Sequence, residues 1–129
     1  MARVRFNIIK PKKRPSNKTL RDRCDDLWRK IIKRKGRCDK CGSRYGLEAH
    51  HVIGRGNNNL RWDLRNGICL CLECHDQQKA KPKKFLKWFE QRRPDDYEYL
   101  LKEKNRILDF INYDKILEYL SVMKVENGD

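Results

Sequence analysis

The sequence predicts an α+β fold, in which a small unit of two strands and one helix is organised around bound metal and flanked by further helices. Three observations support this class. Two Cys-x-x-Cys pairs, Cys38/Cys41 and Cys71/Cys74, frame a segment that contains two of the three histidines of this 129-residue chain, and the third follows it directly. Between the pairs, short apolar runs are separated by a loop rich in Gly and Asn, which is typical of paired strands. Before and after the segment, apolar residues recur at helical spacing.

The chain begins with an extended basic arm and a helix. Residues 1–15 are rich in Lys and Arg and contain two prolines, so they form either a solvated tail or an arm that contacts DNA phosphates. A helix is predicted over residues 16–36, with Ser16 as its N-cap and Gly36 at its end. Its apolar stripe consists of Leu20, Cys24, Leu27, Trp28, Ile31 and Ile32. Its opposite face is basic and favours a phosphate-tracking surface, formed by Arg21, Arg29, Lys30, Lys33 and Arg34.

Residues 37–81 form the predicted metal-centred core. The first cysteine pair is followed by a strand over about residues 47–53, a loop over residues 54–59 and a strand over about residues 65–70. The second cysteine pair opens a helix over about residues 72–81, which Pro82 ends. Such a unit is too small to bury a sufficient core of its own, so its folding is expected to depend on metal.

Residues 82–129 form a predicted helical extension. Helices are expected from Pro82 to near Pro94, from a cap at Asp95 or Asp96, and from about Asn112. Their aromatic and aliphatic residues lie at helical spacing, which is typical of packing surfaces. The sequence leaves open whether these residues pack within the chain or in a homodimer.

Charge points to a nucleic-acid partner. The formal net charge is +14, and residues 1–37 carry 15 basic and 3 acidic side chains, which gives +12. The first residues form no continuous apolar stretch, and the longest apolar run, residues 68–72, is far below the roughly 20 residues that cross a bilayer. We therefore expect no secretory signal, no membrane partner and a cytoplasmic protein, which for a phage-encoded chain means the host cell. In that reducing setting, paired cysteines are interpreted as metal ligands before disulfides.

The four paired cysteines match a structural zinc site, because two tight turns that each present two thiolates complete a tetrahedron. Cys24 is expected to be a small buried side chain, and Cys69 is the second choice as ligand if Cys71 is not one. A zinc site in which His75 replaces one cysteine remains an alternative. Four-cysteine coordination leaves the histidines for another role. His50 and His51 are adjacent on a strand and point to opposite sides, so one can ligate a metal with His75 while the other accepts a proton.

These residues resemble the HNH endonucleases, in a string that runs from Glu48-Ala-His50-His51 through Asn66 to Cys71-x-x-Cys74-His75. The resemblance implies a ββα-metal fold, with His51 as general base, His50 and His75 as ligands of a divalent ion, and Asn66 bracing the loop or ring of His51. It also implies a structural Zn²⁺ on the four paired cysteines. Because the residue before the base is histidine where aspartate is common, the catalytic ion could be Mg²⁺, Mn²⁺, Ni²⁺ or Zn²⁺.

The implied activity is metal-dependent hydrolysis of DNA phosphodiester bonds, with Arg55 and Arg61 added to the helix residues as DNA contacts. A second resemblance, to the phage NinG/Rap recombination nucleases, rests on the basic helix before Cys-x-x-Cys-Gly and on residues 60–66. It implies branched as well as double-stranded DNA as substrate. Phage recombination or packaging proteins are further candidate partners. The alternative function is a zinc-stabilised DNA-binding module without catalysis, which would leave the three histidines and Asn66 unexplained.

Overall fold

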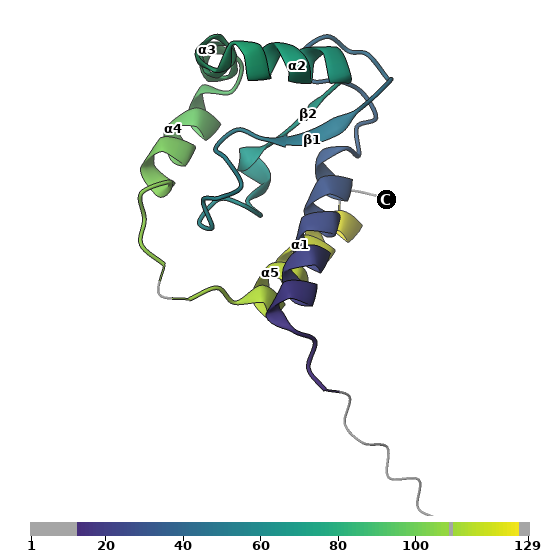
Figure 1. The fold of residues 1–129 in the computed structure, drawn as a ribbon, viewed down its shortest axis with the longest axis vertical. Helices are drawn as coiled ribbons and strands as arrows, with labels where there is room; N and C mark the ends of the chain where they lie inside the picture. The colour runs from purple at the N-terminus through teal and green to yellow at the C-terminus, as the bar shows by residue number, and fades with distance from the viewer. Residues whose placement is uncertain (1–12, 109, 127–129) are drawn as a thin grey trace, which may run out of the picture.

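The computed structural model describes residues 13–108 and 110–126, and its described part confirms the α+β class (Figure 1). Most of the predicted arm, residues 1–12, lies outside the described residues. The helices and strands, in chain order, are α1 (Asn17–Ile32), β1 (Glu48–His51), the 3-10 helix η1 (Leu64–Asn66), β2 (Gly67–Leu70), α2 (Leu72–Ala80), α3 (Pro82–Arg92), α4 (Pro94–Glu103) and α5 (Tyr113–Glu126). No helix among these residues is long and apolar enough to cross a membrane.

Helix α1 begins as predicted and ends earlier than predicted. The Ser16 hydroxyl accepts a hydrogen bond from the Thr19 amide at 3.2 Å, which caps the first turn. The helix ends at Ile32, and Gly36 supplies the left-handed turn (φ +69°) four residues later. The predicted apolar stripe is confirmed, and its buried members are Leu20, Cys24, Trp28 and Ile31.

Strands β1 and β2 form a two-stranded antiparallel sheet, in which His50 pairs with Ile68 and His51 with Gly67. Neighbouring residues on a strand face opposite sides, so His50 and Ile68 face one side of the sheet and His51 and Gly67 face the other. The second strand begins at Gly67, two residues later than predicted. The reason is the Asp63 carboxylate, which accepts a hydrogen bond from the Arg65 amide and starts a 3-10 turn that ends with Asn66.

Two hydrophobic clusters lie on the two sides of this sheet. The first lies between the sheet and α2, α3 and α4, and includes Ile68, Leu70, Phe85, Phe89 and Leu100. The second lies between α1 and α5 and includes Cys24, Trp28, Ile31, Trp62 and Leu120. The aromatic and aliphatic residues of α3, α4 and α5 named here are thus buried within the chain, as expected for a packing surface.

Gly67 sets how closely α1 approaches the sheet. A Cβ atom added at Gly67 would lie 2.1 Å from Ile32 Cδ1 and 2.9 Å from Trp28 Cζ2. Any side chain at this position would therefore push α1 away from the strand that pairs with His51. Only glycine allows this packing without displacement.

Of the three C-terminal helices, only α4 differs from prediction at its start. Helices α3 and α4 begin directly at Pro82 and Pro94, where proline's fixed φ and missing N–H suit a first turn. The prediction that Asp95 or Asp96 caps α4 is wrong, because both lie inside its first turn. Helix α5 begins after Asn112, whose side-chain oxygen accepts a hydrogen bond from the Lys115 amide at 3.1 Å.

Candidate metal and catalytic site

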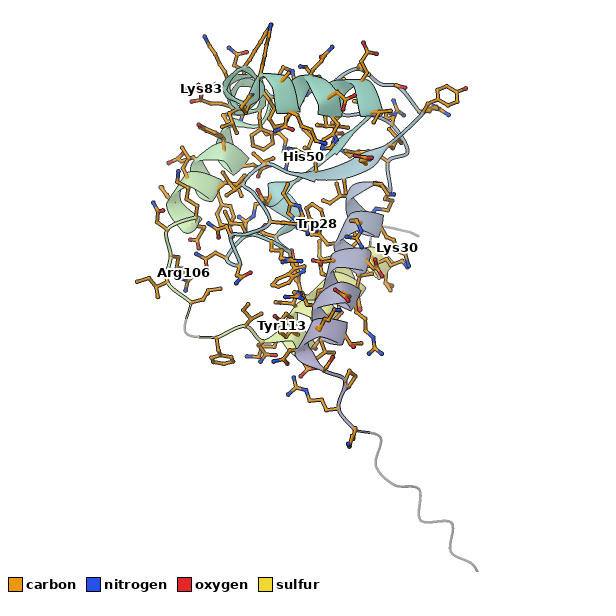
Figure 2. All side chains as sticks on the ribbon, viewed as in Figure 1. Trp28, Lys30, His50, Lys83, Arg106 and Tyr113 are labelled. Carbon is orange, nitrogen blue, oxygen red and sulfur yellow. The ribbon has the colours of Figure 1, made fainter. Side chains whose placement is uncertain are left out.

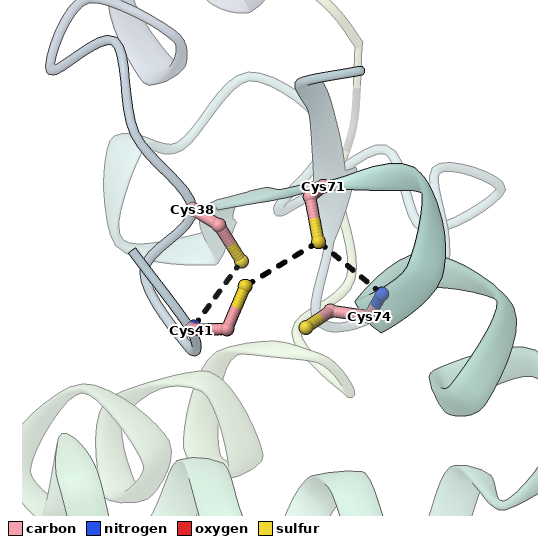
Figure 3. A group of neighbouring side chains, drawn as sticks. All are labelled: Cys38, Cys41, Cys71 and Cys74. Carbon is pink, nitrogen blue, oxygen red and sulfur yellow. Dashed lines mark hydrogen bonds between the residues drawn. The ribbon is translucent and has the colours of Figure 1, made fainter. Parts of the chain in front are cut away.

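Four cysteines converge at one point between the first turn of α2 and the loop before β1 (Figure 3). The sulfur atoms of Cys38, Cys41, Cys71 and Cys74 all lie within 4.8 Å of one another. Among the described residues, no other group of three or more histidine, cysteine or acidic side chains comes this close. Four thiolates at this spacing fit a tetrahedral structural zinc.

Each cysteine pair is shaped by backbone hydrogen bonds to sulfur. The Cys41 amide donates to Cys38 Sγ at 3.5 Å, and the Cys74 amide donates to Cys71 Sγ at 3.4 Å. Burial opposes ionisation of Cys38, but the surrounding backbone N–H groups outweigh it and lower the pKa of this thiol to about 7. Cys38 therefore favours thiolate, the form that binds metal.

Cys24, Cys69 and His75 are not part of the group formed by the four paired cysteines. Cys24 is fully buried in the second cluster, as predicted. Cys69, the second choice as ligand, is buried in β2, where its amide donates to the Asp39 carboxylate at 2.8 Å. Burial raises the pKa of both Cys24 and Cys69 to about 11, which keeps them as neutral thiols.

His50 and His75 meet on the α2 side of the sheet. Their ring centroids are 5.1 Å apart, and the Phe85 ring packs edge-on against His50. Nε2 of His50 is buried and has no hydrogen-bond partner among the described residues. His75 Nδ1 lies 3.0 Å from a carboxylate oxygen of Glu48. Glu48 lies two residues before His50 on β1, so the three side chains share one side of the sheet.

Burial lowers the pKa of His50 to about 4, and the neighbouring charges of His75, His51 and Lys79 act in the same direction. His50 is therefore a neutral imidazole at neutral pH. A neutral imidazole with an unpaired nitrogen is the form that ligates a metal ion. Since a buried polar atom without a partner is costly, the unpaired Nε2 of His50 fits a position reserved for a ligand.

His51 lies on the opposite, α1 side of the sheet. Its ring stacks on Trp28 with a centroid distance of 3.9 Å and an interplanar angle of 7°. Its Nε2 lies 2.8 Å from the backbone oxygen of Arg61. A carbonyl oxygen only accepts hydrogen bonds, so Nε2 carries the proton and Nδ1 keeps a free lone pair. Burial lowers the pKa of His51, which favours this neutral form.

The Arg61 carbonyl is held in place from α1. The Arg61 guanidinium donates to both carboxylate oxygens of Asp25, at 3.0 and 2.7 Å, and Trp62 Nε1 donates to the same carboxylate at 2.8 Å. The Arg61 and Asp25 side chains are only 14% and 12% exposed. Arg61, predicted to contact DNA, is thus engaged in a mostly buried ion pair beneath the site.

Asn66 is fully buried, and its side-chain amide closes the loop that follows β1. Its oxygen accepts from the Ile53 amide at 2.7 Å, and its nitrogen donates to the backbone oxygens of Ile53 and Leu60 at 2.9 and 3.0 Å. Leu60 immediately precedes Arg61, whose carbonyl receives the His51 hydrogen bond. Asn66 therefore contacts the loop and not the imidazole ring.

The other predicted DNA contacts differ in how exposed they are and in whether they already have a partner within the chain. Lys30, Lys33 and Arg55 are exposed, and Arg55 is near enough to His51 for its charge to act on that imidazole. Arg29 pairs with Asp26. The remaining two are Arg21, whose Nε is buried, and Arg34, which donates to the backbone of α5 at Met123. The basic face is therefore partly packed against α5 and partly open.

The sequence around this site matches a known protein family. Residues 38–81 match the family model of the HNH endonucleases, and the predicted resemblance over residues 38–75 is confirmed. Residues 38–81 are therefore called the HNH segment. No curated protein and no solved structure matches the chain. The resemblance to NinG/Rap nucleases stays a prediction.

Three residues of the site were not predicted. Trp28 and Asp25 lie on α1, outside the HNH segment, and reach the His51 side only through tertiary packing, so no local pattern indicates them. Glu48 could have been found, because strand alternation puts it on the side of His50. Its contact with His75 follows from the position of α2 across the sheet.

Proposed function

We propose that this protein is a metal-dependent endonuclease that hydrolyses DNA phosphodiester bonds. One observation carries the proposal. Adjacent histidines on β1 face opposite sides: Nε2 of His50 is buried without a hydrogen-bond partner among the described residues, and Nδ1 of His51 keeps a free lone pair. A phosphodiester at this edge of β1 would have a metal ligand on one side and a proton acceptor on the other.

His50 and His75 are the proposed ligands of a divalent ion, which supplies charge stabilisation to the phosphate and its leaving oxygen when bound. Glu48 supports this role, because a carboxylate that accepts the Nδ1 proton of His75 leaves Nε2 of that ring as the coordinating atom. The two imidazoles leave positions for water and phosphate oxygen. Nitrogen ligands favour transition metals such as Mn²⁺, Ni²⁺ and Zn²⁺ over strict Mg²⁺ dependence.

His51 is the proposed general base. Its Nε2 proton is donated to the Arg61 carbonyl, and the stacked Trp28 ring restricts rotation of the imidazole, so Nδ1 accepts the proton of the attacking water. Asp25 orients this base indirectly through Arg61. Asn66 has a similar indirect role, since it holds the loop that carries the Arg61 carbonyl.

DNA is the proposed substrate because the chain is strongly basic and because the exposed Arg55 is near enough to His51 for its charge to act on that ring. Arg55 would contact a phosphate near His51, and Lys30 and Lys33 would contact phosphates from the exposed face of α1. The four-cysteine centre, with its structural zinc, would hold β2 against the start of α2 and so fix the position of His75. Branched DNA, and a place beside phage recombination or packaging proteins, are narrower proposals that rest on the NinG/Rap resemblance.

Cleavage of supercoiled plasmid DNA tests the proposal. Zinc-loaded protein is incubated with Mn²⁺, Mg²⁺ or Ni²⁺, and the expected result is nicked or linear product with at least one ion. The matched control is His51→Ala, which should reduce the rate by about 10² to 10⁴ while DNA binding persists. Binding without cleavage under every ion would instead support the zinc-stabilised DNA-binding module.

A further inference from the structure

A second basic surface lies on the side of the sheet opposite to α1. Residues 79–87 contain five lysines and no acidic residue, although residues 82–129 as a whole carry ten basic and ten acidic side chains. Only Lys83, Lys84 and Lys87 fall within that longer segment, where acidic residues elsewhere cancel their charge in the sum. We define the lysine surface as Lys79, Lys81, Lys83, Lys84 and Lys87, at the end of α2 and the beginning of α3.

The charge of the lysine surface is not neutralised within the described part of the chain. All five side chains belong to exposed residues, and none has a carboxylate within ion-pair distance among residues 13–108 and 110–126. Helix α4 differs, because Lys102 pairs with Glu98 at 3.1 Å. On α1, the exposed Arg29 likewise pairs with Asp26.

One member of the lysine surface, Lys79, lies beside the candidate metal site, near enough for its charge to act on His50. Lys79 follows His75 by four residues on α2, so both side chains lie on one face of that helix. Phe85 of α3 packs against His50 with a centroid distance of 5.6 Å, and the α3 lysines occupy the opposite, outward face of this helix. Figure 2 shows Lys83 pointing outward from α3, away from the sheet.

The same surface borders a hollow of about 280 Å³, lined by cations and amides that include Lys40, Lys81, Lys84, Gln77 and Gln78. Lys40 lies between Cys38 and Cys41, and its ammonium is 5.6 Å from the ring centre of Trp88 on α3. Donors without acidic partners around a shallow hollow suit phosphate oxygens.

We propose that the lysine surface binds the phosphate backbone of the DNA on the α2 side of the cut position. This inference rests on the proposed function. Together with Arg55 and the exposed basic residues of α1, it gives the duplex two basic contact regions, one on the α1 side of the sheet and one on the α2 side. Such lysine contacts add sequence-independent affinity and fix how the duplex lies across β1.

The experiment compares two variants with the same loss of charge. Lys83, Lys84 and Lys87 are changed to Gln in one variant, and Lys102, Lys104 and Lys115 are changed to Gln in the other. Both are made in the His51→Ala background, and binding to a short duplex is measured as a function of salt concentration. Each lost phosphate contact lowers the slope of log affinity against log salt by about 0.9, so the first variant should lose about 2 to 3 and the control less than about 1.

Equal slopes for the two variants would overturn the proposal, provided that both melt like the parent. Protection of Lys83, Lys84 and Lys87 from acetylation by bound duplex is the second expected result, and unchanged acetylation would also contradict it. Failure of the proposed function is separate: it would appear as absence of cleavage by the native chain, whereas binding slopes do not depend on cleavage.

Discussion

The two sides of β1 are built in different ways. On the α2 side, His50, His75 and Glu48 all come from the HNH segment, and the four-cysteine centre lies at the start of the same helix. On the α1 side, His51 comes from the segment, but its surroundings include Trp28 and Asp25 from a helix that precedes it. The metal side is thus locally encoded, whereas the side of the candidate base depends on long-range packing.

This difference predicts distinct consequences of mutation. Changes at the four cysteines should act through loss of zinc and fold, changes at His75 through loss of the divalent ion, and changes on the α1 side through the position of the His51 ring. Single substitutions on each side distinguish these outcomes.

Cys71→Ser should abolish the cooperative unfolding transition, because structural zinc sites contribute on the order of 10 kcal/mol to small domains. The matched control is Cys69→Ser, which changes a buried thiol that is not part of the four-cysteine site. Zinc content and thermal melts are measured for both. If Cys71→Ser binds stoichiometric zinc and melts like the native chain, Cys71 is not a ligand that the structural zinc site requires.

Asp25→Ala should lower the free energy of unfolding by about 3 kcal/mol at pH 7, because it leaves Arg61 mostly buried without its partner. Burial opposes ionisation of Asp25, but hydrogen bonds from Arg61 and Trp62 outweigh it and hold its pKa below the ordinary value. The stabilisation is therefore complete above about pH 5, and is lost as the pH falls through the unfolded-state and then the lower folded-state pKa.

Urea unfolding between pH 7 and pH 3 measures this difference. The gap between the native chain and Asp25→Ala should be constant above about pH 5 and shrink below about pH 4. Asp26→Ala is the matched control, since its carboxylate is 63% exposed and its pair with Arg29 should contribute at most about 1 kcal/mol. If both variants lose the same free energy of unfolding, the buried Asp25–Arg61 pair does not stabilise the α1 side more than an exposed pair does.

Gly67→Ala should destabilise the protein by about 1 to 3 kcal/mol, because the new methyl group overlaps Ile32 and Trp28. Gly54→Ala is the control, since a Cβ there meets nothing within 4 Å. Chemical unfolding gives both values. If Gly67→Ala is as stable as Gly54→Ala, α1 does not pack against β2 as closely as described.

Much of the fold could be predicted from the sequence, because it depends on local patterns. The Ser16 cap, the apolar stripe of α1 and the spacing of the cysteine pairs are short-range signals, and the structure confirms them. The end of α1 and the start of β2 were misplaced. In the second case, the Asp63 side chain competes with strand pairing by forming a 3-10 turn, which the apolar pattern does not show.

The candidate site was predictable only in part. The period of a strand is enough to separate His50 from His51, and it also indicates Glu48. The bond from His51 to the Arg61 carbonyl, the stacked Trp28 and the Asp25 ion pair join residues that are 10 to 36 positions apart along the chain. Such contacts depend on how α1 packs against the sheet. The charge of the lysine surface is visible in the sequence of residues 79–87, but a division of the chain at residue 82 separates Lys79 and Lys81 from the other three lysines.

The most direct test of the division across β1 compares Mn²⁺ binding and plasmid cleavage in His75→Ala and His51→Ala. Both variants are prepared with zinc in the four-cysteine site, and Mn²⁺ affinity is measured by calorimetry alongside the cleavage rate. Both variants should lose cleavage, but only His75→Ala should lose Mn²⁺ affinity, by about tenfold or more. Equal loss of Mn²⁺ binding in His51→Ala, or cleavage by that variant at the native rate, would contradict this prediction.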